Sequence, residues 1–414
     1  MDPRNKRILL FFYFVFSLFP HSHANGSESL FKLKGWMKTT FSVHDTSSLE
    51  NETTKRIDAP LRMELSGKIN SALSLNCAYE ISPLYEKEKN FSNGMFFNTQ
   101  ILTYRADDIN NKIHSTKNGN YTFEVNQNLD RLFFSIQTDS ADIKFGRQSI
   151  SFGSSRFVNP LDVLTSFSFD TIDQEERFGV DAIRIRLPFG EMGEIDFGYI
   201  FGDSFEYENS AFYLNTKFSV KDSDYTLMAM AFMENLLLGL DFQTSVLEAG
   251  FWMEAGYVIP DALKKSNSDD KNYLRISTGF DYNFLSRLYG FIEYHYNEAG
   301  SSSLDGYLEN GNKTAYKQGR VFLLSRHYLI PGFSCELSPL CNLRSSIIIN
   351  LQDGSSFISP NVVYSLAENF YLEAGAFIST GKSSSVDYRK HKLNVASEFG
   401  LYQNIYFLSL RFYF

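Results

Sequence analysis

The chain has 414 residues and a formal net charge of −9, and it is rich in Phe (40) and Tyr (24) although its mean hydropathy is slightly negative. The acidic balance argues against a nucleic-acid-binding protein. Beyond the N-terminal region, no apolar run approaches the roughly 18 residues that a transmembrane helix needs, and no Pro/Gly/Ser-rich linker divides the chain.

The N-terminal region predicts export. Arg4, Lys6 and Arg7 precede an apolar run at residues 8–19, and small residues then end at Ala24. This is the pattern of a signal peptide, so we expect residues 1–24 to be removed and residues 25–414 to form the mature domain. The alternative, an anchoring helix, is disfavoured because the run is shorter than the roughly 20 residues needed to span a bilayer.

Apolar and polar residues then alternate with a period of two, as in β-strands whose two faces meet different surroundings. In the first such segment, Leu33 and Met37 share a face opposite Trp36 and Lys38. The polar stretch from residue 83 to about residue 128 interrupts the pattern, and we predict that it is mainly a long outward loop with a weak strand near 96–104.

The central block, 131–199, contains two hairpins separated by a polar insert at 154–177. In the first hairpin the alternation slips at Gly146, which predicts a β-bulge that turns Arg147 inward. In the second hairpin, isoleucine alternates with arginine over 182–187. The pattern fits either a soluble sheet with one wet face or a transmembrane barrel with a lipid-facing exterior and a polar lumen.

The C-terminal strand favours the barrel. Its apolar residues share one face and end on an aromatic residue; they are Tyr406, Leu408, Leu410, Phe412 and Phe414. A soluble sheet rarely leaves such an edge at a terminus, because the edge would template aggregation. In a barrel this strand pairs with the first strand and no edge remains. The strand also resembles the C-terminal signal that the outer-membrane assembly machinery of Gram-negative bacteria reads.

We therefore predict an all-β fold, a single closed antiparallel transmembrane β-barrel with short periplasmic turns and long extracellular loops. The short turns are expected near Asn70, Asp139, Gly190, Lys221, Ser245, Leu285, Pro339 and Glu368. With both termini periplasmic, these turns give about 18 strands, with about 16 as the alternative. This count requires residues 380–400 to form the last outer loop, and another polar loop is expected at 297–318.

Several motifs carry a resemblance to a known group. The runs Phe145-Gly-Arg-Gln148, Asn159-Pro-Leu-Asp162, Asp173-Gln-Glu-Glu-Arg177 and Ser359-Pro-Asn-Val-Val-Tyr364 resemble the signature of porin-like outer-membrane barrels that are distantly similar to alginate-export porins. The resemblance implies a pore in the outer membrane of a Gram-negative bacterium and says little about the cargo. Some similar barrels sheath multihaem cytochromes, but this chain has no Cys-x-x-Cys-His site, so that role would require a partner.

The alternation also predicts which charges face the lumen. Bases dominate the early strands, and acids such as Glu254 and Glu293 dominate the later ones. If the insert at 154–177 folds inward, its charges meet at a constriction where a low dielectric screens them poorly. The candidate pore-lining and constriction residues are Arg131, Lys144, Arg147, Arg156, Asp162, Asp173, Glu175, Glu176, Arg177, Arg184, Arg186, Glu194 and Asp196. For the last four, pairing across the second hairpin is an equally good interpretation, and the two can coexist.

The sequence offers little for catalysis. It contains no Gly-x-Ser-x-Gly or His-Glu-x-x-His motif, and His295 beside Glu293 is better read as a polar lumen residue, so we predict no enzyme, no metal and no cofactor. Cys335 and Cys341 flank a predicted periplasmic turn. Because the periplasm is oxidising, they are a candidate disulfide, with two free thiols as the alternative.

The predicted function is an outer-membrane porin or channel for diffusion or export of small polar or charged solutes. The alternatives are a barrel sheath of a porin–cytochrome electron conduit and a surface-recognition or structural barrel without an open pore. The expected partners are outer-membrane lipid, the assembly machinery acting through the Phe414 strand, small polar solutes and, for the sheath, a periplasmic protein. No nucleic acid is expected.

Overall fold

The computed structural model describes residues 31–45, 53–87, 104–264, 270–387 and 392–414. The expected signal peptide lies outside these residues. In the described part of the chain, no helix is long and apolar enough to cross a bilayer.

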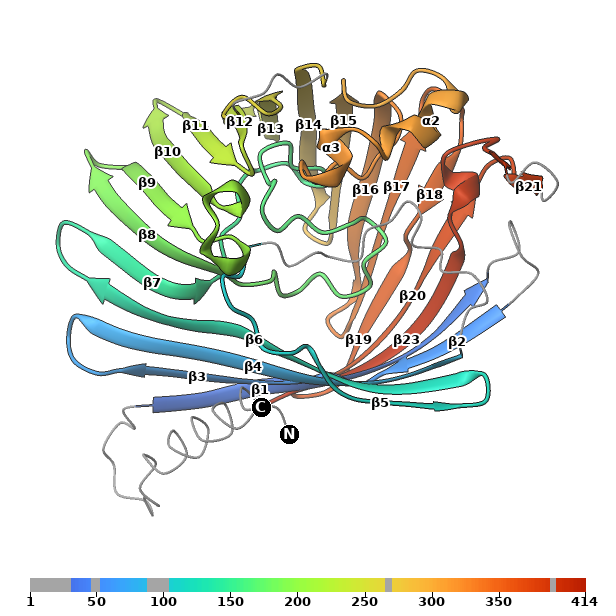
Figure 1. Ribbon diagram of the computed structural model, residues 1–414, viewed down its shortest axis with the longest axis horizontal. Helices are drawn as coiled ribbons and strands as arrows, with labels where there is room; N and C mark the ends of the chain where they lie inside the picture. The colour runs from blue at the N-terminus through green and yellow to red at the C-terminus, as the bar shows by residue number, and fades with distance from the viewer. Residues whose placement is uncertain (1–30, 46–52, 88–103, 265–269, 388–391) are drawn as a thin grey trace, which may run out of the picture.

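Apart from one small hairpin in the last outer loop, the described strands form one antiparallel sheet that closes on itself (Figure 1). The strands of its first half are β1 (Phe31–Asp45), β2 (Thr53–Asp58), β3 (Leu61–Lys68), β4 (Leu73–Lys87), β5 (Lys112–Asn118), β6 (Tyr121–Gln137), β7 (Asp142–Gln148), β8 (Val180–Phe189), β9 (Gly193–Ile200), β10 (Ala211–Val220) and β11 (Ser223–Phe232). Those of the second half are β12 (Asn235–Val246), β13 (Ala249–Ile259), β14 (Tyr273–Leu285), β15 (Leu288–Asn297), β16 (His327–Ser338), β17 (Cys341–Asn350), β18 (Ser356–Ile358), β19 (Asn361–Ala367), β20 (Phe370–Thr380) and β23 (Asn404–Tyr413).

The barrel has 18 strands, as predicted. Strands β2 and β3 are one barrel strand interrupted at Pro60, and β18 and β19 are another interrupted at Pro360, because proline has no N–H to give to the ladder. Strand β5 adds to the outer part of β6 and does not extend round the barrel. The predicted closure is confirmed, since β1 pairs with β23 in a register that places Met37 opposite Phe412.

The exterior of the barrel is apolar. The five outward residues of the C-terminal strand, Tyr406 to Phe414, are each 42–49% exposed, whereas Trp36 and Lys38 on the inner face of β1 are only 6% and 2% exposed. A row of aromatic contacts crosses β10 to β14 and runs through Phe218, Tyr225, Phe242, Phe251 and Phe280. A closed sheet with an apolar outer band and aromatic girdle residues is built to face lipid.

Every predicted short turn joins two strands of the barrel, and residues 381–403 join β20 to β23 as expected. This last outer loop contains a small hairpin of β21 (Ser385–Asp387) and β22 (Lys392–Asn394) and a short 3-10 helix, η3 (Phe399–Leu401). The loop predicted at 297–318 contains the helices α2 (Leu304–Asn310) and α3 (Thr314–Lys317).

Two expectations were wrong. The described part of the stretch from residue 83 to about residue 128 is not mainly loop, because β4 runs to Lys87 and β5 pairs with β6 in a hairpin that projects beyond the barrel (Figure 1). The strand expected near 96–104 falls almost wholly outside the described residues.

The β-bulge lies on β6 and not at Gly146: Ala78 pairs with Arg131 and Tyr79 with Leu129, which leaves Asp130 as the extra residue. Gly146 keeps its register and has a φ of 116°.

The insert between β7 and β8 runs across the interior of the barrel (Figure 1, green). Its apolar residues Phe152, Leu161 and Leu164 are buried against the inner faces of β8 to β14, where Tyr213 and Leu237 are fully buried. Further along, Phe169 packs edge-on against Phe357 of β18 and Phe399 of the last outer loop. Its ring also contacts that of Tyr402, with the ring centres 5.1 Å apart. The predicted inward-folded loop is therefore present, and its apolar residues supply the core of the molecule.

Candidate functional site

Two glutamates of the acidic wall hold the first part of the insert. Glu254 on β13 and Glu293 on β15 are both fully buried. Each accepts three backbone N–H groups at 2.7–3.1 Å; the donors are Ser154, Ser155 and Leu161 for Glu254, and Arg156, Phe157 and Val158 for Glu293. Hydrogen bonds to a charged acceptor are the strong kind, so these carboxylates fix the insert to the wall. Both were predicted as lumen charges, but their role as anchors was not predicted.

The acidic second part of the insert contacts the basic wall. Lys38 on β1 is 2% exposed, and its ammonium lies 2.8 Å from Asp173 and 2.6 Å from Glu175. Glu176 lies 3.7 Å from both Arg62 on β3 and Arg131 on β6. Burial raises the pKa of Glu176, against the opposing effect of these arginines. The insert therefore spans the lumen between its two oppositely charged walls.

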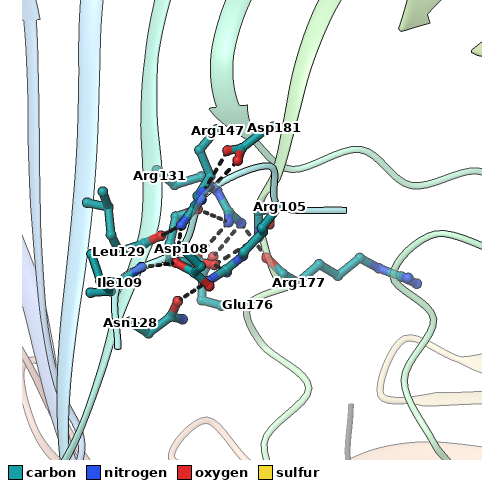
Figure 2. Close-up of polar contacts among 12 residues, drawn as sticks. Arg105, Asp108, Ile109, Asn128, Leu129, Arg131, Arg147, Glu176, Arg177 and Asp181 are labelled. Atoms are coloured by element: carbon teal, nitrogen blue, oxygen red, sulfur yellow. Dashed lines mark hydrogen bonds and ion pairs between the residues drawn. The ribbon is translucent and has the colours of Figure 1, made fainter. Parts of the chain in front are cut away.

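The C-terminal root of the insert is clamped by a buried ion network (Figure 2). Arg131 donates to the carbonyl of Arg177, and Arg105 donates to the carbonyl of Gly179 at 3.0 Å. Asp130, the bulge residue, is 1% exposed and accepts the N–H of Gly179 at 2.8 Å. Because the bulge adds one residue to β6, it supplies the carboxylate that ties the insert to the sheet.

Arg147 extends the same network (Figure 2). It is 5% exposed, and it binds Asp181 through Nε at 2.7 Å and Asp108 through Nη1 at 2.7 Å. Asp108 also binds Arg105 at 2.9 Å. The sequence interpretation missed Arg105 and Asp108 because both lie in the stretch that was predicted to be an outward loop.

The arginines of the second hairpin are paired, as the alternative interpretation expected. Arg184 binds Asp196 at 2.6 Å, and Arg186 lies 3.9 Å from Glu194. Arg186 also pairs with Asp142 on β7, which was not predicted. Lys144 lies on β7, between these arginines and β6. Its ammonium group is 5.6 Å from the ring centre of Phe133.

A cavity of about 260 Å³ lies between the insert, the wall of β14 and β15, and residues 320–323. Four arginines line it and, among the described residues that do so, none is acidic; they are Arg156, Arg177, Arg275 and Arg320. Sequence reasoning selected the first two as constriction residues and did not select Arg275 or Arg320. The structure brings them together because the insert folds back against β14.

The four arginines differ in how they are neutralised. Arg156 binds Asp281 at 2.7 Å, and Arg177 pairs with the fully buried Asp162. Burial raises the pKa of Asp162, although Arg177 opposes this effect. Arg275 is 3% exposed, its Nε has no hydrogen-bond partner among the described residues, and its Nη1 is 3.5 Å from the carbonyls of Pro160 and Gly319. A buried guanidinium with an unused donor is the strongest signal for a ligand in this cavity.

His295 also lines the cavity but is engaged in structural contacts. Its Nδ1 lies 2.8 Å from the hydroxyl of Ser277, and that hydroxyl donates to the carbonyl of Val158 at 2.6 Å. The serine proton is therefore directed at the insert and not at the imidazole, which is not the arrangement of an activated nucleophile. Among the described residues, no group of three or more His, Cys, Asp and Glu side chains is placed to hold a metal ion.

The disulfide hypothesis was wrong, since Cys335 and Cys341 are both free. In the ladder between β16 and β17, Cys335 lies opposite Leu343, and Cys341 lies opposite Ser338. The two cysteines are thus diagonal neighbours. Diagonal side chains in a sheet are typically about 7 Å apart, beyond the Cβ separation of about 4 Å that a disulfide needs.

Comparison with known proteins gives a likeness of fold and no closer relation. No family model and no curated protein matches the chain. Among solved structures, Pseudomonas aeruginosa OccK7 (OpdD) matches with a TM-score of 0.53 and 8% identity over 94% of this chain and 99% of that one. OccD3 (OpdP) from the same organism matches with a TM-score of 0.52 and 8% identity over 95% and 93%. The outer membrane protein OprD of that organism gives 0.51 and 7%, with 93% of each chain covered.

At these identities the likeness concerns the fold. The distant similarity to alginate-export porins is not shown by these structures and stays a prediction. Combined with the closed sheet and its apolar exterior, the comparisons show that the chain has the fold of a porin-like transmembrane β-barrel, like the outer-membrane proteins that it matches.

Proposed function

We propose that this protein is an outer-membrane channel that passes small anionic solutes through a lumen narrowed by the insert at 154–177. The observation that carries the proposal is the arginine-lined cavity, in which Arg275 keeps an unused donor. The porin-like fold supports the channel, and the cavity supports the sign of the charge that the channel prefers.

The anion preference follows from where the charges are neutralised. Most acids of the lumen are already engaged: Glu254 and Glu293 bind backbone N–H groups, and Asp173 and Glu175 bind Lys38. The cavity is lined by four guanidinium groups and by no carboxylate among its described residues; Arg156 and Arg177 pair with Asp281 and Asp162 outside this lining, and Arg275 keeps an unused donor that points to a further anionic partner. In a narrow channel of low dielectric, this local positive charge acts strongly on a passing ion. It outweighs the net charge of −9 of the whole chain, because salt screens distant charges beyond about 8–10 Å.

The contacts of the insert weigh against the sheath alternative. The insert binds both walls, so a cytochrome could enter the lumen only by displacing it from at least six backbone hydrogen bonds to Glu254 and Glu293. A surface-recognition barrel without a pore remains the alternative that electrical measurements separate from a channel. We expect the Phe414 strand to be the element that the assembly machinery reads.

The test is ion selectivity in planar bilayers under a potassium chloride gradient. We expect an anion-selective reversal potential in the native protein, and a several-fold loss of the chloride-to-potassium permeability ratio in Arg275→Gln and Arg320→Gln. The matched control is Arg344→Gln, which removes an exposed arginine of β17 that does not line the cavity. Unchanged selectivity in both cavity variants would refute the anion preference, and no conductance in the native protein would refute the channel.

A further inference from the structure

The lining of the arginine-lined cavity includes buried polar atoms that have no hydrogen-bond partner among the described residues. Among them are Nε of Arg275, the hydroxyl oxygen of Ser166 and the side-chain amide oxygen of Asn159. Buried polar atoms in native proteins nearly always have a partner, which is the protein, an ordered water or a bound molecule. Unused atoms gathered on one cavity therefore indicate a binding site, and their chemistry restricts what the site binds.

These atoms offer a ligand both a donor and an acceptor. The Nε–H of Arg275 can only donate and the amide oxygen of Asn159 can only accept, whereas the hydroxyl of Ser166 can do either. Within the described part of the chain, Arg275 lies 3.5 Å from two backbone carbonyls and forms no ion pair, so an anion is the partner that its charge lacks. The amide oxygen of Asn159 would repel a bare oxyanion, and it therefore requires a ligand that also carries a hydrogen-bond donor.

The surrounding charge decides what kind of donor the ligand carries. Four arginines line the cavity, so an ammonium group would be repelled and the donor is a neutral group. An O–H on the anion itself is the smallest group that meets both demands. Inorganic phosphate keeps such a proton at neutral pH, whereas sulfate does not. The volume of about 260 Å³ holds an ion of this size together with several water molecules, each of which takes about 30 Å³.

Three separate parts of the chain meet at the cavity. The insert supplies Arg156 and Arg177, strand β14 supplies Arg275, and the segment between α3 and β16 supplies Arg320. The backbone of Arg320 has a φ of 54°, a left-handed conformation that residues with a Cβ rarely adopt and that persists only where the surroundings impose it. An anion in the cavity would attract all three parts at once.

We propose that the cavity binds a protonated oxyanion of the phosphate class, and that the bound ion holds the insert and the segment before β16 against the wall of the barrel. The inference rests on the proposed function, because it assigns a ligand class and an effect on the loops to the same cavity. It adds a discrimination that charge alone does not give. Selection by charge would favour sulfate, which has the higher charge at neutral pH, whereas the oxygen of Asn159 favours phosphate.

The test is hydrogen exchange, read by mass spectrometry on the full-length protein in detergent micelles at neutral pH. Inorganic phosphate or sulfate is added to a chloride buffer at constant ionic strength. The reporting peptides cover residues 159–166 and 315–323, in which the N–H groups of Thr165 and Val321 donate within their own loops at 3.3 Å. At about ten times its Kd, phosphate should slow their exchange about tenfold, while β23 and the sulfate sample stay unchanged. Equal protection by the two ions, or no protection by phosphate, would overturn the proposal.

Three variants assign the effect to the cavity. Asn159→Ala removes the acceptor and keeps the backbone carbonyl that accepts the N–H of Asp162, so the preference for phosphate over sulfate should be lost. Arg275→Gln should abolish protection by phosphate, and Arg344→Gln, the same change outside the cavity, should keep the native response. A preference that survives in Asn159→Ala would count against the inference.

The outcomes separate this inference from the proposed function. Anion-selective currents in potassium chloride without protection by phosphate would refute the binding site and leave the channel standing. Protection by phosphate in a protein without anion selectivity would refute the proposed function and keep the site.

Discussion

Glu398 lies fully buried between the last outer loop and the segment that precedes β16. Its carboxylate accepts the N–H of Leu324 at 2.7 Å, the hydroxyl of Tyr328 at 2.5 Å and the amide of Asn350 at 2.7 Å. The other titratable groups that face it are acids, Asp353 and the tyrosine hydroxyls, and no cation among the described contacts balances its charge. Burial raises the pKa of Glu398 to about 8.

This shift predicts a pH dependence of the lumen loops. The pKa of Glu398 is raised while the last outer loop packs against the segment before β16, so the carboxyl group binds a proton more tightly in this packed state than when the loop is released. The packed state therefore loses stability as pH rises from about 4.5 to about 8. The change is at most on the order of 5 kcal/mol. Protection of the Leu324 N–H against hydrogen exchange should fall over this range, and Glu398→Gln should flatten the profile. A native profile that is already flat would contradict the assignment.

At the scale of the element, the short strand β7 depends on one glycine. Gly146 has a φ of 116°, a conformation that residues with a Cβ rarely adopt, and an added Cβ would lie 2.3 Å from the carbonyl oxygen of Leu132. The glycine thus lets the chain pass close to β6 just before Arg147 enters the ion network. It changes the direction of the strand without the change of register that a bulge would bring.

Gly146→Ala should therefore destabilise the barrel by about 2–4 kcal/mol, because the new Cβ must displace the backbone of β6. Gly190→Ala is the control, since Gly190 also has a positive φ of 60° but nothing lies within 4 Å of its Cβ position. That variant should cost about 1 kcal/mol. Urea unfolding of protein refolded in vesicles measures both, and equal effects would show that the close approach to Leu132 is unimportant.

For the whole molecule, the position of the insert sets how open the lumen is. Removing Glu254 or Glu293 leaves three N–H groups of the insert, most of them part-buried, without this acceptor, at a cost of up to about 1–3 kcal/mol each. Glu254→Ala and Glu293→Ala should thus release the first part of the insert and raise single-channel conductance, while the Gln variants keep one acceptor oxygen and fall between. Glu248→Ala in an exposed turn should leave conductance unchanged. Identical conductance in all variants would mean that the insert does not obstruct the channel.

The alternation of apolar and polar residues was enough to predict the barrel, its 18 strands and its closure between β1 and β23. The reason is that a strand with one apolar and one polar face repeats every two residues, and this repeat can be recognised within each strand by itself. The same logic identified the turns from Asn70 to Glu368. It failed for β5 and the start of β6, where Tyr121, Phe123 and Val125 alternate in a stretch that was dismissed as loop because of its polar composition.

The partners of the charged residues were decided by the tertiary structure. Sequence placed Glu254, Glu293, Lys38 and Arg131 inside the barrel, but whether each faces water, the insert or another strand depends on contacts between residues more than 40 positions apart. Asp130 became a clamp only because a bulge rotated it inward, and Cys335 and Cys341 stayed apart because register set them diagonally. Periodicity fixes the side of the wall on which a residue lies, whereas the path of the insert through the lumen determines which charges remain for a solute.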